Sequence, residues 1–148
     1  MSATATDPET FYRETVLAHS RAPRHAAPPS RVDASGHAEN RMCGDAVDVY
    51  LMRGADGAMA QIGFQAEGCA ISIAAADLMA EALTGRTESD AATLDRAFRA
   101  MLASGEPGPA LPRELHAFAG LAAYPARRGC ALLPWQALAT ALGQGPQR

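Results

Sequence analysis

Three cysteines and one aspartate are the residues of this chain whose types and positions best suit chemistry. Cys43, Cys69 and Cys130 each lie beside a glycine, and each stands where one local sequence pattern gives way to another. A cysteine kept for packing usually lies within an apolar run, because a free thiol behaves as a small hydrophobe. A cysteine beside a glycine at an element boundary is instead a thiol that the backbone can present. Asp45 is two residues from Cys43, across Gly44.

These four side chains suit two kinds of chemistry. Thiolate is the form of cysteine that binds metal ions and the form that attacks sulfur. Three thiolates and a carboxylate also complete a four-ligand zinc site, because zinc accepts carboxylate oxygen as well as sulfur. Taken singly, each cysteine is typical of inert packing, and Asp45 of a turn residue that bonds its own backbone. Together they favour one shared site. The histidines are weaker ligand candidates: His19, His25, His37 and His116.

A predicted β-hairpin brings two of the cysteines together. Residues 46–53 alternate between apolar and polar side chains, residues 59–66 form a second strand, and a glycine-containing turn at 54–57 joins them. Cys43 precedes the first strand and Cys69 follows the second, so both are expected at the open end of the hairpin. Residues 31–37 are predicted to add an edge strand.

Helical spacing accounts for most of the remaining chain. The predicted helices cover residues 7–19, 71–82, 89–102, 113–121 and 132–142. Pro134 is acceptable only in the first turn of the last helix, which would therefore begin just after Cys130. Cys69 and Cys130 would then both lie at helix N-termini, where the helix dipole favours a thiolate. Strands grouped before helices predict an α+β fold, with helices packed on one face of a small antiparallel three-stranded sheet.

Composition limits the function classes. The 148 residues are expected to form one domain, 1–148. All 13 basic residues are arginine, which excludes a Walker loop and a Schiff-base lysine. A net charge of −3 without a clustered basic face predicts no nucleic-acid partner. No segment approaches the roughly 20 apolar residues that span a bilayer, and residues 1–15 are not typical of a signal peptide. We therefore expect a cytoplasmic protein with no membrane partner, whose odd cysteine count argues against a disulfide framework.

Three sequence blocks around the cysteines carry a resemblance to a known family. Residues 39–45 read ENRMCGD, residues 68–74 read GCAISIA and residues 127–133 read RRGCALL. In order and spacing, these blocks resemble the U-type iron–sulfur assembly scaffolds, and within them the SufU branch, over nearly the whole chain. Arg41 stands where the family motif has proline. Gly129 stands where the IscU branch has a histidine, and residues 86–121 are longer than in IscU; both features resemble SufU.

The resemblance implies a fold, a site and a role. The fold would be SufU/IscU-like. Zinc would be held by Cys43, Asp45, Cys69 and Cys130. Cys43 would accept persulfide sulfur from a SufS-type cysteine desulfurase, in a zinc-dependent, sulfurtransferase-like activity. Downstream iron–sulfur assembly proteins would be further partners.

Three alternatives remain open from the residues. The same ligands would suit a scaffold that builds and transfers a [2Fe–2S] cluster, because thiolates bind both zinc and iron–sulfur clusters. A structural zinc in a domain without this activity is the second alternative. A cysteine–histidine hydrolase is the third. Arg127 and Arg128, beside Cys130, are either contacts for an acidic face of the desulfurase or solvated loop residues.

Overall fold

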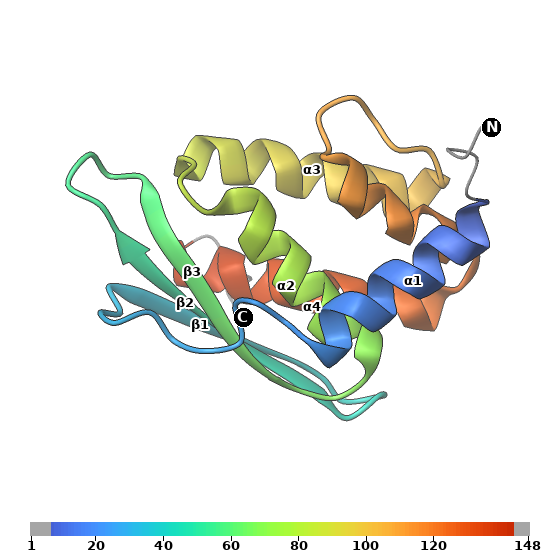
Figure 1. Cartoon of the computed structure of the whole chain (residues 1–148), viewed down its shortest axis with the longest axis horizontal. Helices are drawn as coiled ribbons and strands as arrows, with labels where there is room; N and C mark the ends of the chain where they lie inside the picture. Colours follow the sequence, from blue (N-terminus) through green and yellow to red (C-terminus); the bar gives the residue numbers. More distant parts are fainter. Residues whose placement is uncertain (1–6, 144–148) are drawn as a thin grey trace.

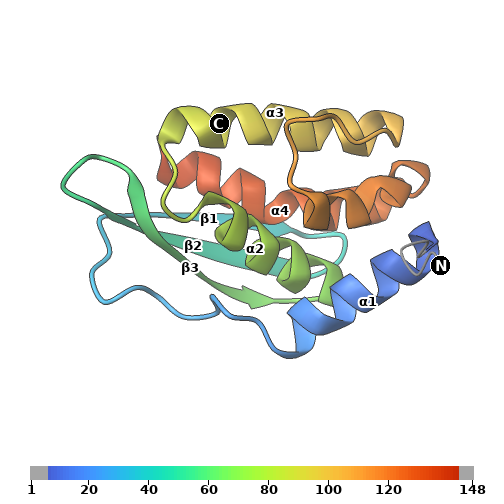
Figure 2. The ribbon, with the colours of Figure 1, turned by 45° about the horizontal axis from the view of Figure 1, so that its top comes forward.

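The computed structural model describes residues 7–143 and shows helices stacked over one face of a three-stranded antiparallel sheet (Figure 1). The elements, in order, are α1 (Pro8–Arg21), β1 (Ala34–Asn40), β2 (Asp45–Arg53), β3 (Met59–Glu67), α2 (Ala70–Leu83), α3 (Glu88–Ser104), the 3₁₀ helix η1 (Arg113–Ala123) and α4 (Pro125–Ala141). The strand order is β1-β2-β3, and α2 and α4 lie directly on the sheet (Figure 2). The predicted α+β fold is confirmed.

The core forms where the alternating strand residues meet the helices. Val47, Val49 and Leu51 of the central strand are fully buried, and Ile62 and Phe64 of β3 lie beside them. Each buried side chain of this kind contributes about 1.5–3 kcal/mol relative to exposure to water. Because side chains alternate across a strand, this one buried face fixes the register of the hairpin.

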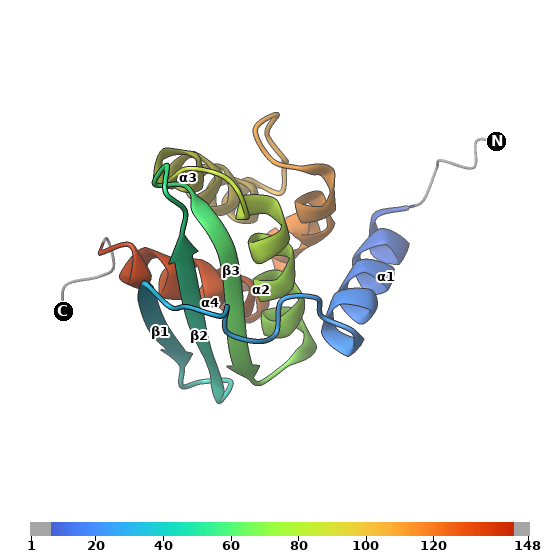
Figure 3. The same cartoon turned by 60° about the vertical axis from the view of Figure 1, so that its left-hand side comes forward.

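The outer helices extend this core away from the sheet. Figure 3 shows α1 against α2, on the side that the sheet does not reach. Aromatic contacts join four elements: Phe98 of α3 stacks on Trp135 of α4 at 5.1 Å between ring centroids and meets Phe118 of η1 at 5.9 Å. Tyr12 of α1 meets Phe118 edge-on at 6.4 Å. Within residues 7–143, no helix combines the length and apolar character needed to cross a membrane.

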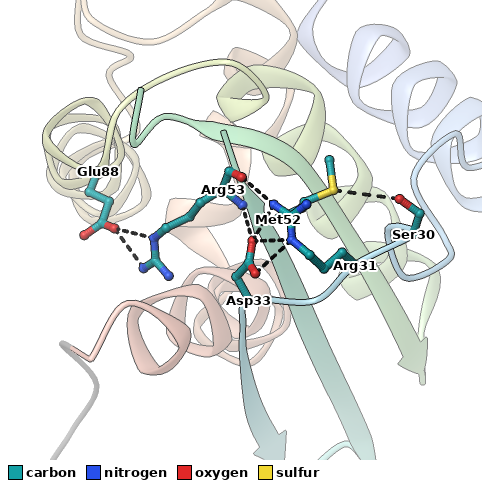
Figure 4. A network of polar contacts seen from close by, with 6 residues as sticks. All are labelled: Ser30, Arg31, Asp33, Met52, Arg53 and Glu88. Atoms are coloured by element: carbon teal, nitrogen blue, oxygen red, sulfur yellow. Dashed lines mark hydrogen bonds and ion pairs between the residues drawn. The ribbon is translucent and has the colours of Figure 1, made fainter. Parts of the chain in front are cut away.

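The edge strand begins three residues later than the sequence pattern predicts. Figure 4 shows the reason: the Arg31 guanidinium binds both oxygens of Asp33 and donates to the Arg53 carbonyl at 2.7 Å. Asp33 also accepts the Arg53 amide at 2.7 Å, and Arg53 pairs with Glu88 at the start of α3. Residues 31–33 therefore form a polar clamp, and ladder pairing starts at Ala34. This clamp lies at the end of the sheet opposite to the cysteines.

The last helix differs from the prediction. It begins at Pro125 instead of residue 132, so Pro134 lies in its interior and Cys130 lies within the helix. A proline has no amide hydrogen to donate to the carbonyl four residues earlier, which here belongs to Cys130. The Ser72 hydroxyl of α2 lies 3.3 Å from this carbonyl oxygen and can donate to it. Because the Ser72 hydroxyl has one proton and also lies 2.7 Å from Asp45, this contact offsets only part of the bond that the proline removes.

Candidate metal centre

The open end of the hairpin places Asp45 against the start of α2. Ala46 pairs with Glu67 across the two strands, so that Asp45, the first residue of β2, lies beside Gly68 and Cys69. Gly68 has a positive φ of 144°, and a Cβ atom there would collide with the Asp45 carboxylate. Glycine is therefore required before this cysteine, for both its conformation and its size.

Hydrogen bonds from α2 hold both carboxylate oxygens of Asp45. Oδ1 accepts the backbone N–H of Cys69 at 3.1 Å. Oδ2 accepts the Ser72 hydroxyl at 2.7 Å and lies 3.2 Å from the Cys69 thiol. Cys69 is the N-cap residue of α2, and Ser72 is three residues further along, so its hydroxyl reaches back over the first turn. Asp45 is only 3 % exposed and is fixed in place by these donors.

Two of the three thiols lie near this carboxylate, and the third, that of Cys43, contacts one of them. One ligand atom from each of Asp45, Cys69 and Cys130 lies within 4.8 Å of the others. The Cys43 sulfur is 3.6 Å from the Cys130 sulfur. The structure therefore brings all four side chains predicted as ligands to one corner of the molecule; their binding of a metal remains a prediction.

The three cysteines differ in their access to solvent. Cys130 is buried, Cys69 is half-buried and Cys43 is exposed. Cys43 lies on the short loop that joins β1 to β2, where its amide bonds the Asn40 carbonyl at 3.2 Å. The adjacent Met42 is 95 % exposed. Among these thiols, Cys43 is the one that another macromolecule can reach.

The Asp45 carboxylate is an anion without a positively charged partner in this corner. Burial alone would raise the pKa of Asp45, but the hydrogen bonds from Ser72 and Cys69 outweigh it and hold that pKa below its usual value of 3.8. Within residues 7–143, no arginine or histidine lies within ion-pair distance of Asp45. A buried charge is costly unless it is paired. A cation held by this carboxylate and the thiols would supply that pairing.

Cys130 does not have the environment that the sequence predicted. Burial, and next its hydrogen bond to Cys43, raise the pKa of the Cys130 thiol. The predicted effect of a helix N-terminus is missing because Cys130 lies inside α4, beyond its first turn. A bound cation is what would favour the thiolate here, because metal binding displaces the thiol proton.

The donor set fits zinc. Three thiolates and one carboxylate oxygen match the four ligands and the ligand types that zinc takes in tetrahedral sites. The same thiolates suit an iron–sulfur cluster. Each histidine is bound elsewhere: His19 to Asp77, His25 to Glu81, His37 to Asp48 and Glu39, and His116 to the Leu111 carbonyl.

Two polar residues of α2 received no role from the sequence. Ser72 lies in the second cysteine block, and its spacing of three from an N-cap residue could have indicated a side chain directed at the helix start. Asp77 is completely buried in an otherwise apolar stretch of α2. An acidic residue in such a stretch indicates a buried, hydrogen-bonded carboxylate, although nothing local identifies its partners.

Comparisons with known proteins agree with this geometry. A family model described as the NifU-like N-terminal domain matches residues 11–131. The chain is 32% identical over 134 residues to the iron–sulfur cluster assembly scaffold protein IscU of Streptococcus pyogenes serotype M1, covering 89% of this chain and 82% of that protein. It is 29% identical over 134 residues to the zinc-dependent sulfurtransferase SufU of Bacillus subtilis, covering 88% of each.

Solved structures give the same result. FiSufU from Fervidobacterium islandicum AW-1, described as a candidate scaffold for the SUF system, superposes with a TM-score of 0.82 at 26% identity, over 90% of this chain and 98% of that one. A nitrogen-fixing NifU-like protein from Brucella abortus superposes with a TM-score of 0.75 at 24% identity, over 90% of this chain and 93% of that one. The second likeness shows the shared fold alone.

Proposed function

The chain belongs to the family of NifU-like N-terminal domains, and we propose that it accepts persulfide sulfur from a cysteine desulfurase at a zinc centre. The observation that carries the proposal is the corner itself: a buried carboxylate and two less accessible thiols lie beside one exposed thiol. The similarity to a relative named as a zinc-dependent sulfurtransferase supports the choice of metal and of reaction.

We assign the zinc ligands as Cys43, Asp45, Cys69 and Cys130. When bound, zinc supplies a positive charge that keeps thiols in their reactive thiolate form, and it has no redox chemistry of its own. The Ser72 hydroxyl and the Cys69 N–H hold the Asp45 carboxylate in the position from which it would bind, and Gly68 leaves room for it. Hydrogen bonds from neighbouring side chains to a metal ligand orient that ligand and tune the site.

Cys43 is the proposed sulfur acceptor, because its side chain is the exposed thiol. Its thiolate attacks the outer sulfur of the persulfide on the desulfurase cysteine. A new sulfur–sulfur bond forms on Cys43, and the bond between the outer sulfur and the desulfurase sulfur breaks. The desulfurase sulfur leaves with the electron pair and takes up a proton, which regenerates its thiol. The exchange needs no external oxidant or reductant.

The partners follow from this reaction. We propose a SufS-type enzyme as the sulfur donor and downstream iron–sulfur assembly proteins as the recipients, all in the cytoplasm. The chain's contribution would be a sulfurtransferase-like step, in which it protects a reactive sulfur between the donor and the recipient protein.

A [2Fe–2S] scaffold is the second candidate function. The 32% identical relative named as a cluster assembly scaffold favours it, and the three thiols are suitable cluster ligands. Colour separates the two candidates. A cluster absorbs visible light, whereas zinc is silent, so a colourless protein that contains zinc supports the sulfur acceptor.

The test is transfer of sulfur to Cys43 by the SufS-type desulfurase of the same organism, with cysteine as substrate. With a thiol reductant present, we expect the chain to stimulate sulfide release. In a parallel reaction without reductant, it should carry one added sulfur on Cys43, detected by mass spectrometry of the intact protein. Cys43→Ala should lose both effects, whereas Val32→Ala, an exposed residue at the far end of the sheet, should keep them. Undiminished stimulation by Cys43→Ala would refute the assignment.

A further inference from the structure

A groove of about 790 Å³ lies between the first half of α1, the 3₁₀ helix η1 and the start of α4. Its walls are largely apolar or aromatic, and two arginines lie along it. The residues used in the argument below are Phe11, Tyr12, Arg113, Tyr124 and Arg127. Tyr124 is more than half exposed, although it is a large aromatic residue. This groove has no part in the chemistry assigned to the cysteines.

Both arginines are held in place by aromatic rings. The guanidinium carbon of Arg113 lies 5.0 Å from the centre of the Phe11 ring, and that of Arg127 lies 5.1 Å from the centre of the Tyr124 ring. Stacking fixes the plane of a guanidinium and leaves the N–H groups along its edge available to an acceptor. The N–H groups of both guanidiniums are therefore oriented for hydrogen bonds, but they donate none to another residue within 7–143.

Neither arginine has an acidic partner within residues 7–143. Other arginines of the chain do have one: Arg13 pairs with Glu9, Arg31 with Asp33, Arg53 with Glu88 and Arg99 with Asp95. Glu9, the acidic residue that lines the groove, is the one that pairs with Arg13. The groove therefore presents two positive charges that its own lining does not neutralise, on an apolar surface.

The groove adjoins the metal centre. Arg127 precedes Cys130 by three residues in α4, which is less than one helical turn and about 4.5 Å along the helix axis. A protein that brings a persulfide to Cys43 therefore passes within reach of this surface. A docking site here would orient the partner without occupying the reacting thiol.

We propose that this groove binds a segment of the cysteine desulfurase that carries carboxylate side chains beside apolar ones. The inference rests on the proposed function and names the surface that serves it. Carboxylates match the two guanidiniums, because arginine binds them with paired, charge-assisted hydrogen bonds. Apolar side chains match the aromatic walls, which would lose their contact with water. A nucleic acid would match the arginines but not these walls, and the net charge of −3 would repel it.

The test is a charge reversal, Arg113→Glu, in desulfurase stimulation assays at low and moderate salt. We expect the concentration of this chain that gives half-maximal stimulation to rise at least tenfold at low salt. The substitution should change this half-maximal concentration more than it changes maximal stimulation, because Arg113 does not contact the cysteines. Added salt should weaken the wild-type chain more than the variant, since it screens the attraction. Phe11→Ala, which removes the stacking ring, should weaken docking in the same direction.

The matched control is Arg96→Glu, the same charge change at an exposed arginine of α3 outside the groove. It should leave stimulation unchanged, and thermal unfolding should show that each variant is folded. If Arg113→Glu behaves like Arg96→Glu while the wild type still delivers sulfur to Cys43, the docking site is refuted and the function stands. If Arg113→Glu lowers only maximal stimulation, docking is refuted as well. If the wild type takes no sulfur at all, the proposed function fails and the docking site fails with it.

Discussion

Two buried carboxylates of this protein, Asp45 and Asp77, have opposite surroundings. The Oδ1 atom of Asp77 accepts the backbone N–H groups of Arg24 and His25 at 2.8 and 2.9 Å. Its Oδ2 atom lies 2.7 Å from the Nδ1 atom of His19. Asp45 also accepts one backbone N–H, but its other neighbours are a hydroxyl and a thiol.

The difference separates a structural carboxylate from a functional one. The donors around Asp77 come from the end of α1 and the following loop, and they tie both to α2. Asp77 is completely buried, away from any thiol, and its oxygens are already used. Asp45 is held as firmly, yet its donors bring no positive charge. It lies among three thiols, one of them exposed. We infer that Asp77 stabilises the fold and that Asp45 is a ligand for a cation.

The largest expected effect is on stability, at the structural carboxylate. Asp77→Ala would leave the backbone N–H groups of Arg24 and His25 and the His19 ring without their buried acceptor. The free energy of unfolding should fall by about 3–5 kcal/mol, since each hydrogen bond to a charged group contributes about 1.5–3 kcal/mol. Asp77→Asn is the matched control, because its amide oxygen can still accept from the two backbone groups; its loss should be smaller. Urea unfolding measures both. An Asp77→Ala protein as stable as the wild type would remove the distinction between the two carboxylates.

The next effect is on zinc affinity, at the functional carboxylate. Asp45→Ala removes one proposed ligand and should weaken zinc binding by roughly 100-fold or more. Losing a residue that only hydrogen-bonds to a ligand already costs about 10–100-fold in metal affinity. Competition with a coloured chelator measures the affinity. The zinc-free variant should also be less stable than the zinc-free wild type, because the Ser72 hydroxyl and the Cys69 N–H lose their acceptor. Unchanged zinc affinity would exclude Asp45 from the site.

A smaller effect on zinc affinity is expected at Ser72, which contacts Asp45 but is not itself a proposed ligand. Ser72→Ala removes the 2.7 Å hydrogen bond to Asp45 and the donor available to the Cys130 carbonyl. Zinc binding should weaken by about tenfold. Ser72→Thr keeps the hydroxyl and should restore much of the affinity if its extra methyl group fits this buried position. If Ser72→Ala binds zinc like the wild type, Asp45 does not depend on this contact for its position.

The smallest effect concerns an exposed histidine–carboxylate cluster, which contrasts with the buried pair of His19 and Asp77. Hydrogen bonds to Glu39 and then to Asp48 raise the pKa of His37 above its usual value of 6.5. Its stabilisation is therefore fully present below pH 6.5 and is lost as the pH rises through the higher folded-state pKa. Exposed pairs contribute only about 0.2–1 kcal/mol. The stability difference between wild type and His37→Gln should be measurable at pH 5.5 and should disappear in mildly alkaline solution.

Local signals explain what could be predicted from the sequence. The alternation of residues 46–53 and the glycine turn at 54–57 are features of neighbouring residues, so the hairpin could be anticipated, and with it the position of Asp45 beside Cys69 at its open end. The spacing of Asp45 from Cys43, and a last helix packed on the sheet, already suggested one shared site for Asp45 and the three cysteines; the family resemblance assigned them as ligands. In the structure Asp45, Cys69 and Cys130 cluster, and Cys43 contacts Cys130.

The remaining features depend on contacts between distant segments. The start of α4 could not be predicted because proline is normally excluded from a helix interior; the hydroxyl that contacts the carbonyl freed by Pro134 comes from Ser72, in a different helix. The partners of Asp77 lie more than 50 residues away in sequence. The groove of Arg113 and Arg127 forms where α1 meets η1, and no periodic pattern indicates which helices will be neighbours.

The central inference is that the corner around Asp45 holds a zinc ion through three sulfurs and one oxygen. Zinc-edge X-ray absorption of the freshly purified protein, combined with elemental analysis, tests this most directly. We predict one zinc per chain, with three sulfur ligands at about 2.3 Å and one oxygen ligand at about 2.0–2.2 Å. A protein that contains no zinc, or zinc bound by fewer than three sulfurs in the wild-type chain, would contradict this assignment.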